Sequence, residues 1–197
     1  TNYLKSTNPE LLYSIEPSPL LYSQLVKTEI EDIQKTGNNQ RFFTRNNFLQ
    51  DNIEELANKI NTIIYISVLE HIEDDVQELK IANKFLEPNG HILIFVPSLQ
   101  WLYGSHDKMV GHYRRYYKEQ LIEKVEISGF KIKKVKYFDF IGIIPWWICF
   151  CLLKMTKLNT KQSKSYDKYA VPVIKFFEKI VSPVIGKNLI LIAEKVE

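Results

Sequence analysis

Short apolar runs along the chain predict the strands of a sheet. Asn61–Val68 and His91–Pro97 are the longest of these runs, and their composition is typical of strands buried on both faces. In Phe130–Phe138 apolar and polar residues alternate with a period of two, which indicates a half-exposed edge strand. Three shorter runs also predict strands: Leu11–Glu16, Arg41–Thr44 and Asn188–Lys195.

Longer segments with apolar residues every three or four positions predict helices between these strands. In the first of them Ser18 suits the N-cap, Pro19 the first helical position and Gly37 the position after the last turn. The other expected helices are Ile72–Leu86, Tyr117–Gly129, and two segments at about 143–156 and 167–181.

Strand and helix alternate throughout the chain, which predicts an α/β fold. The length of 197 residues fits one domain with a mainly parallel sheet and helices on both faces. Ligands bind such sheets beyond the carboxyl ends of the strands. The residues expected there are Glu16, Asn46, Asn47, Ser67–His71 and Pro97–Tyr116.

Composition narrows the class of protein. The net charge of +3 is too small to predict a nucleic-acid-binding protein. Cys149 and Cys151 lie two apart in an apolar run, so no disulfide framework or zinc pattern follows and a cytoplasmic location is expected. The opening residues, TNYLKSTNPE, contain no apolar core of a signal peptide.

Glu16 is the first candidate for ligand binding. An acid that closes a strand in a nucleotide-binding half accepts hydrogen bonds from both ribose hydroxyls. The alternative is that Glu16 only favours the N-terminus of the following helix through the helix dipole.

The order of several motifs resembles the class I S-adenosylmethionine-dependent methyltransferases, in particular a bacterial-type subgroup. The motifs are SIEPS, VLEHIEDD, FLEPNGHILIFVP, WLYGSHDKMVGHYRRYYKEQL and GKNLILIAEK, which together extend over nearly the whole chain. LEHIEDD followed about forty residues later by GHYRRY is the most specific pair. The resemblance implies a Rossmann-like, doubly wound sheet with an antiparallel last strand.

The resemblance also implies S-adenosyl-L-methionine as the cofactor and suggests its binding residues. Glu16 would bind the ribose hydroxyls, and Asn46 or Asn47 would approach the adenine. Ile66 and Ser67 would line the methionine end.

One motif of the family has no counterpart in this sequence. The family begins with a strand and a glycine-rich turn of the form D-x-G-x-G, but no two of the seven glycines here lie two positions apart. TNYLKST resembles the helix that follows that turn. We therefore expect the central strand to precede Thr1, in residues outside this sequence.

Glu70 and His71 end the strand Asn61–Val68 side by side. Glu70, Glu73, Asp74 and Asp75 suit a helix N-terminus, which is the structural interpretation of these acids. His71 is expected at the mouth of the cofactor pocket and is a candidate catalytic residue. Some related enzymes hold a divalent metal with a Glu-x-x-Glu-His pattern, but Ser67 stands in place of the first Glu. We therefore predict no metal site from the sequence.

The segment Gly104–Tyr117 combines two histidines, one acid and two arginines after a strand. His112, or alternatively His106, is the candidate general base. Arg114 and Arg115 are candidates to hold an anionic group of the acceptor. In the alternative interpretation, one arginine pairs with Asp107 or a helix acid and orders the loop.

Phe140–Leu153 is uncharged over fourteen residues, fewer than a helix needs to cross a bilayer. We interpret residues 140–183 as a helical lid or cap before the last strand. Trp146 and Trp147, with Lys154 following at the end of the segment, are also typical of an interfacial helix. Such a helix would place the protein at the inner face of the membrane.

The function expected from these observations is methyl transfer to a small-molecule or lipid-linked saccharide acceptor, with oxygen as the receiving atom. Two alternatives remain open. One is a nicotinamide-dependent oxidoreductase on a similar sheet, and the other is an inactive fragment or membrane-docked adaptor. The sequence does not predict the oligomeric state.

Overall fold

The computed structural model describes residues 12–36, 42–156 and 183–196. The chain consists of two compact units, an N-terminal unit, Thr1–Leu56, and a C-terminal unit, Ala57–Glu197. The expectation that the chain forms one domain with a lid stays a prediction, and the helix expected at about 167–181 lies outside the described residues.

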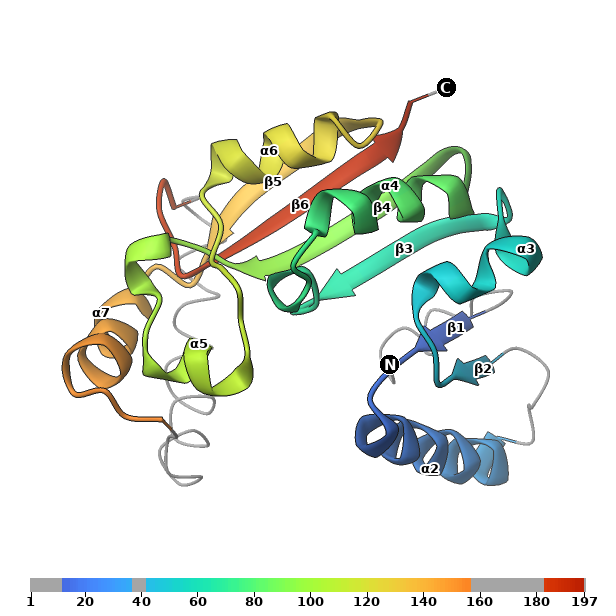
Figure 1. The fold of residues 1–197 in the computed structure, drawn as a ribbon, viewed down its shortest axis with the longest axis horizontal. Coiled ribbons are helices and arrows are strands. Elements are labelled where there is room, and N and C mark those ends of the chain that lie inside the picture. The colour runs from blue at the N-terminus through green and yellow to red at the C-terminus, as the bar shows by residue number, and fades with distance from the viewer. Residues whose placement is uncertain (1–11, 37–41, 157–182, 197) are drawn as a thin grey trace. The chain divides into compact units, whose positions relative to one another are not determined.

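The N-terminal unit contains a parallel strand pair. β1 (Leu12–Ile15) pairs with β2 (Phe42–Arg45), and α2 (Pro19–Thr36) connects them (Figure 1). The short helices η1 (Leu49–Asn52) and α3 (Ile53–Leu56) follow. The predicted strands and helix are confirmed, and α2 begins at Pro19 because proline is pre-organised for the first helical position.

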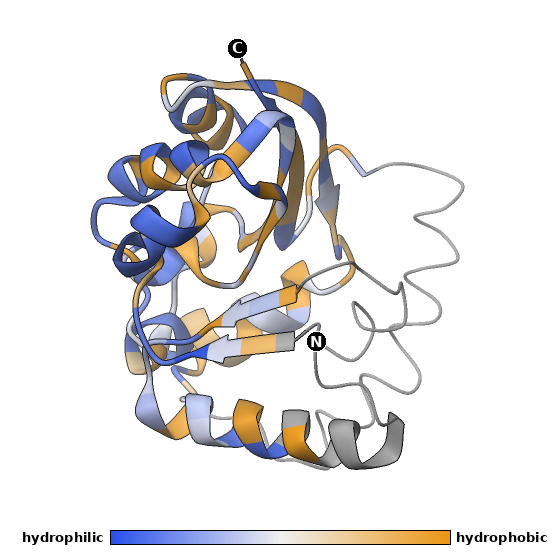
Figure 2. Ribbon diagram, turned by 90° about the vertical axis from the view of Figure 1, so that its right-hand side faces the viewer, coloured by the Kyte–Doolittle hydropathy of each residue, from blue (hydrophilic) through white to orange (hydrophobic). Residues whose placement is uncertain are grey.

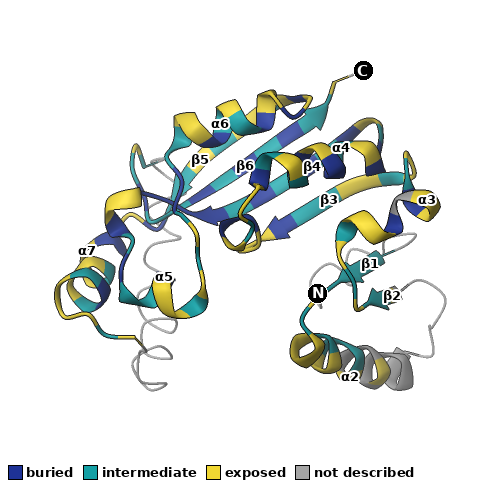
Figure 3. Ribbon diagram, in the orientation of Figure 1, coloured by how far each residue is buried: buried dark blue, intermediate teal, exposed yellow. Residues whose placement is uncertain are grey.

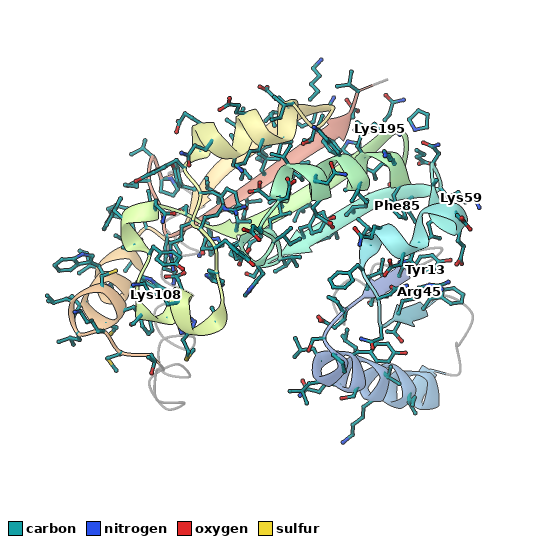
Figure 4. All side chains as sticks on the ribbon, viewed as in Figure 1. Tyr13, Arg45, Lys59, Phe85, Lys108 and Lys195 are labelled. Carbon is teal, nitrogen blue, oxygen red and sulfur yellow. The ribbon has the colours of Figure 1, made fainter. Side chains whose placement is uncertain are left out.

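Ring contacts stabilise the pairing of β1 with β2. The rings of Tyr13 and Phe43, which are opposite each other in the register, stack with their centroids 5.1 Å apart. The guanidinium carbon of Arg45 lies 5.9 Å from the centroid of Tyr13, and Arg45 also forms an ion pair of 2.8 Å with Glu55 (Figure 4).

The C-terminal unit is built on a four-stranded sheet in the order β3-β4-β6-β5. Its strands are β3 (Ile60–Ile66), β4 (Leu86–Pro97), β5 (Phe130–Phe138) and β6 (Asn188–Lys195). β3 and β4 are parallel, whereas β6 is antiparallel to both β4 and β5. The α/β fold with an antiparallel last strand is therefore confirmed, and β5 lies at an edge of this sheet as predicted.

Two amphipathic helices cover one face of this sheet. α4 (Asp75–Phe85) and α6 (Lys118–Glu126) contact each other, and Figure 3 shows buried positions alternating with exposed ones along both. Figure 2 shows that hydrophobic and hydrophilic residues also alternate along the helices. The fully buried side chains at the core of this unit include Leu79, Phe85, Ile92, Ile94, Leu121 and Leu191.

β3 is predicted to be buried on both faces. Among the described residues it pairs with β4 alone, and Tyr65 is its one buried residue. The Tyr65 hydroxyl donates a 2.7 Å hydrogen bond to Glu78 of α4, whereas Ile66 is 59% exposed. The described residues supply no strand on the second side of β3, where the sequence led us to expect the central strand, so burial of β3 on both faces stays a prediction.

The apolar segment after β5 forms shorter helices than the predicted 143–156. α7 (Ile143–Trp146) continues into η4 (Trp147–Leu152), which is π-helical. Trp146 donates from Nε1 to the Leu102 carbonyl at 3.2 Å, so this segment is attached to the loop after β4. Within the described ranges, none of the helices has the length and apolar character needed to cross a membrane.

Candidate active site

The candidate site lies where two strands of the C-terminal unit end. η2 (Leu69–His71) follows β3, and the segment Ser98–Tyr117 follows β4. That segment contains the short helices η3 (Gln100–Leu102) and α5 (Ser105–Val110) before it reaches α6 (Figure 1). Since β3 and β4 are parallel, their carboxyl ends meet at the same edge of the sheet.

Hydrogen bonds fasten the loop after β4 to η2. The backbone N–H of Tyr113 donates to the Glu70 carbonyl at 2.8 Å. The buried Tyr116 hydroxyl lies 3.1 Å from the Leu69 carbonyl and 2.8 Å from Oδ2 of Asp75. These bonds place the side chains of the LEHIEDD and GHYRRY motifs next to each other.

Asp107 is the centre of a buried polar network. Its carboxylate is fully buried and accepts hydrogen bonds from the Gly104 N–H, from Nε of Arg115 and from Nδ1 of His112, each at 2.8–2.9 Å. Burial alone would raise the pKa of Asp107, but the bonds from His112 and Arg115 hold this pKa below its ordinary value. Asp107 is therefore an ionised acceptor near neutral pH.

This acceptor fixes the tautomer of His112. Because the Asp107 carboxylate is ionised, Nδ1 of His112 carries the proton and donates it. In the neutral ring Nε2 is then the nitrogen without a proton, and it lies 3.8 Å from Oε1 of Glu70. The His112 ring also meets the His71 ring edge-on, with centroids 4.5 Å apart.

Glu70 is buried in an unusual state. It is 1% exposed, and neither of its carboxylate oxygens has a hydrogen-bonding partner among the described residues. Burial raises the pKa of Glu70. His112, Ser67 and Arg115 act in the opposite direction but offset only part of this rise. Desolvation and the neighbouring His112 lower the pKa of His71, although this side chain reaches solvent.

A pocket of about 310 Å³ opens beside these residues, near the lower end of the range for ligand sites. Its lining residues are Ser67, Glu70, His71, Pro97, His106, Val110, His112, Arg115, Trp146, Lys187 and Asn188. Two cations flank the Trp146 ring, with Arg115 4.6 Å and Lys187 5.1 Å from the ring centroid.

The structure brings together part of the predicted site. His71, His112, Arg115 and Ser67 all line the pocket, and so does His106, whose Nδ1 lies 3.0 Å from the Thr156 carbonyl. Ser67 adopts a left-handed backbone conformation, φ +53°, where β3 ends. Ile66 precedes it with an exposed side chain.

Both predicted arginines already have partners. Arg114 forms a 2.8 Å ion pair with Asp75 and donates to the carbonyls of Ile72 and Glu73. Arg115 is buried against Asp107. These bonds agree with the interpretation that the arginines order the loop, and a contact of either with an anionic acceptor stays a prediction.

The remaining predicted cofactor residues belong to the N-terminal unit. Glu16 lies directly after β1, and its Oε1 accepts a hydrogen bond of 2.9 Å from the Ser18 N–H at the start of α2. Asn46 donates to the carbonyls of Glu16 and Pro17, so it braces the same turn. Asn47 exchanges amide hydrogen bonds with Asn52. Their contacts with the cofactor stay predictions.

Sequence reasoning missed the contributions of Asp107 and Lys187 to the site, whereas Trp146, which lines the pocket, belongs to the segment interpreted as a lid. Asp107 was considered only as a partner of an arginine, and no local pattern indicates that it also accepts from His112. Lys187 lies 2.7 Å from Asp139, and no local pattern indicates that this residue reaches the pocket.

Comparisons with known proteins identify the family of the chain and its fold. A family model described as a methyltransferase domain matches residues 10–135, which is more than half of the chain. The sequence matches none of the curated proteins.

Solved structures share the fold at low sequence identity. A S-adenosylmethionine-dependent methyltransferase from Mesorhizobium loti has a TM-score of 0.59 and 11% identity, with 98% of this chain and 84% of that chain covered. A putative S-adenosylmethionine-dependent methyltransferase from Listeria monocytogenes has a TM-score of 0.59 and 10% identity, with coverages of 99% and 84%. A putative methyltransferase from Bacillus halodurans has a TM-score of 0.57 and 12% identity, with coverages of 94% and 83%.

Proposed function

The chain belongs to the methyltransferase domain family, and from this premise we propose that it methylates an oxygen atom of a small-molecule or lipid-linked saccharide acceptor. It is a methyltransferase that depends on S-adenosyl-L-methionine. The observation that carries the choice of oxygen is His112, which lines the pocket and whose Nδ1 is held by the buried Asp107.

The residues of each unit fit a role with this cofactor. S-adenosylmethionine supplies an electrophilic methyl group on a sulfonium. Glu16 offers a carboxylate at the end of β1 for the ribose hydroxyls. Ser67 and Ile66 lie at the end of β3, where the pocket begins, and suit the methionine end.

Transfer to a hydroxyl group requires a proton to leave. The acceptor oxygen forms a bond to the methyl carbon, the carbon–sulfur bond breaks, and sulfur keeps that electron pair. The hydroxyl proton passes to Nε2 of His112, and Asp107 stabilises the resulting imidazolium. A sulfur or carbon acceptor that is already anionic would not need this base, so the His112–Asp107 pair supports an acceptor that must lose a proton, such as a neutral hydroxyl.

The lining of the pocket supports a hydroxylated acceptor. Ser67 and Asn188 offer polar groups, and Trp146 offers an aromatic surface. Positively charged groups line the same wall, although Arg115 and Lys187 are paired with Asp107 and Asp139. A saccharide, neutral and rich in hydroxyls, suits this combination better than a strongly anionic molecule.

A methyl-transfer assay tests this function. The protein is incubated with S-adenosylmethionine carrying an isotopic label in the methyl group and with lipid-linked or free saccharides. The expected result is labelled ether product, with a rate about 10²–10⁴-fold lower in His112→Ala. The matched control is His91→Ala, because His91 lies 3.9 Å from Glu194 and does not line the pocket. Equal rates in both variants would remove His112 as the base.

A ligand-binding comparison separates the oxidoreductase alternative. S-adenosylhomocysteine is expected to raise the melting temperature, whereas NADH is expected to leave it unchanged. The opposite pattern would favour nicotinamide chemistry.

Peripheral membrane contact through Phe140–Leu153 is a second part of the proposal. The exposed apolar side chains in this segment are Phe140, Ile141, Ile144, Trp147, Ile148, Leu152 and Leu153. Ile143 and Phe150 are buried and hold the segment on the C-terminal unit, and Lys154 follows it. Burial of each large side chain in a lipid interface contributes about 1.5–3 kcal/mol, enough for reversible attachment.

Flotation with liposomes that contain anionic lipid tests this attachment. The protein is expected to float, and Ile144→Asp combined with Leu153→Asp is expected to abolish flotation. Ile127→Asp changes an equally exposed isoleucine outside the segment and serves as the control. Recovery of the unsubstituted protein only from the lipid-free fraction would contradict membrane contact.

A further inference from the structure

We infer that Glu70, His71 and His112 form a site for a divalent transition-metal ion of the Zn²⁺ or Co²⁺ type. The three side chains each offer one ligand atom, and these atoms lie within 4.8 Å of one another. They come from two separate segments, η2 and the loop after α5, which the Tyr113–Glu70 backbone bond holds together. The inference rests on the pocket of the proposed function but concerns a different property of it.

The donor set fits this class of ion. Two imidazoles and one carboxylate leave coordination positions open, as in catalytic zinc sites with three protein ligands. Imidazole ligands favour Zn²⁺ and similar ions over Mg²⁺ and Ca²⁺, which prefer oxygen. An ion about 2.0–2.2 Å from each atom requires ligand separations of about 3–3.5 Å. The distance between Glu70 Oε1 and His112 Nε2 is 3.8 Å, and all three ligand atoms lie within 4.8 Å of one another, so the side chains would have to move slightly closer together around an ion.

The state of Glu70 is an independent observation. Its carboxylate is almost completely buried, lines the pocket, and lacks a hydrogen-bonding partner among the described residues. A buried carboxylate in that situation is costly unless it binds a cation or a proton. Arg115 is bonded to Asp107 at 2.9 Å and Lys187 to Asp139 at 2.7 Å. His112, with Nε2 3.8 Å from Glu70 Oε1, is the one ion-pair partner of Glu70 among the described residues, and it approaches no closer than this.

His112 is also prepared for coordination. A metal-binding histidine generally donates its other N–H to a carboxylate or a carbonyl, which fixes the ring and its tautomer. Here Asp107 accepts from Nδ1 at 2.8 Å, so the lone pair of Nε2 points towards Glu70. Asp107 is therefore a positioning residue for this site.

A bound ion would change how the acceptor is activated. Nε2 of His112 would be a ligand and no longer the direct proton acceptor. The acceptor hydroxyl would coordinate to an open position, its pKa would fall, and its proton would leave to solvent before methyl transfer. With no ion bound, His112 takes the proton directly, as proposed above.

Titration with Co²⁺ tests the site without cofactor or acceptor. The protein, without a histidine tag and after dialysis against a chelator, is expected to bind one Co²⁺ with a visible absorption band that Zn²⁺ displaces. His71→Ala is the decisive variant because its side chain is accessible and the substitution leaves the core intact. Its affinity is expected to fall by more than about 10-fold, since losing even an outer-shell partner costs about 10–100-fold.

Controls keep the outcomes distinct. His91→Ala removes a histidine outside the pocket and is expected to bind Co²⁺ as tightly as the unsubstituted protein. A melting curve without metal checks that each variant is folded. Unchanged Co²⁺ affinity in folded His71→Ala, an equal loss in His91→Ala, or no band at all would overturn the metal site. None of these results depends on methyl transfer, so the proposed function could fail or survive separately.

Discussion

Nδ1 of His112 donates a hydrogen bond of 2.8 Å to Oδ1 of Asp107, a carboxylate with no exposed surface. The bond determines which ring nitrogen is available to the pocket. Gly104 and Arg115 satisfy the same carboxylate, so the orientation of His112 depends on a network that is closed to solvent.

Asp107→Asn should reveal this dependence. The amide can donate to Nδ1, which would favour the opposite tautomer and turn a protonated Nε2 towards Glu70. We expect the turnover rate for methyl transfer to fall by about 10²-fold or more, with a smaller change in the KM for S-adenosylmethionine. Steady-state kinetics checks this, and Glu55→Gln, which changes an exposed ion pair with Arg45, is the control. A normal rate in Asp107→Asn would separate the tautomer from catalysis.

Protonation of Asp75 should make the protein less stable in acid. Burial disfavours its charge, but bonds from Lys124, Tyr116 and Arg114 lower the pKa of Asp75 below its ordinary value. A lowered folded-state pKa stabilises the fold above the unfolded value of about 3.9, and this contribution is lost as pH falls through the folded-state value. We expect Asp75→Asn to lose about 1–3 kcal/mol at pH 7. Urea unfolding at several pH values should also show that the free energy of unfolding of the variant depends less on pH below about pH 4.

Glu16→Ala should weaken cofactor binding. Loss of charge-assisted bonds to the ribose should reduce affinity for S-adenosylhomocysteine by about 10- to 100-fold, as measured by calorimetry. Glu54→Ala, an exposed acid in α3 of the same unit, should leave the affinity unchanged. The same affinity in both variants would show that Glu16 serves only the turn at Ser18.

Gly104→Ala should loosen the contact between α5 and η4. A Cβ atom at Gly104 would lie 2.6 Å from the Phe150 carbonyl oxygen, so the two backbones would have to separate. We expect a loss of about 1–3 kcal/mol in the free energy of unfolding, measured with urea. Gly111→Ala is the matched comparison, because its Cβ would meet nothing within 4 Å and the cost there would come from its φ of +78°. A cost at Gly104 no greater than at Gly111 would contradict the close approach.

Local patterns predicted the strands and most helices because each depends on neighbouring residues. The N-terminus of α2 at Pro19 and the edge position of β5 follow from such patterns. The helix predicted at 143–156 ends at Leu152 and is π-helical from Trp147. Apolar composition does not distinguish α-helical from π-helical turns. The exposure of β3 depends on what pairs with it, which its own sequence does not contain.

The cluster of Glu70, His71 and His112 was beyond the reach of sequence reasoning for a different reason. Glu70 and His71 could be placed at the end of β3, and His112 after β4, because strand ends are local features. Their convergence depends on the path of the loop between β4 and α6, which is set by long-range bonds such as that from Tyr116 to Leu69. The sequence alone therefore did not indicate that His112 lies beside Glu70 and His71.

The bond from Tyr113 to Glu70 has a consequence for protein engineering. Grafting LEHIEDD alone onto another sheet would transfer a carboxylate and an imidazole without the second histidine or the acid that orients it. A functional transplant must carry the loop through Tyr116 together with η2, at a register where the Tyr113 amide again meets the Glu70 carbonyl. The smallest transferable unit is therefore two segments and the bonds between them.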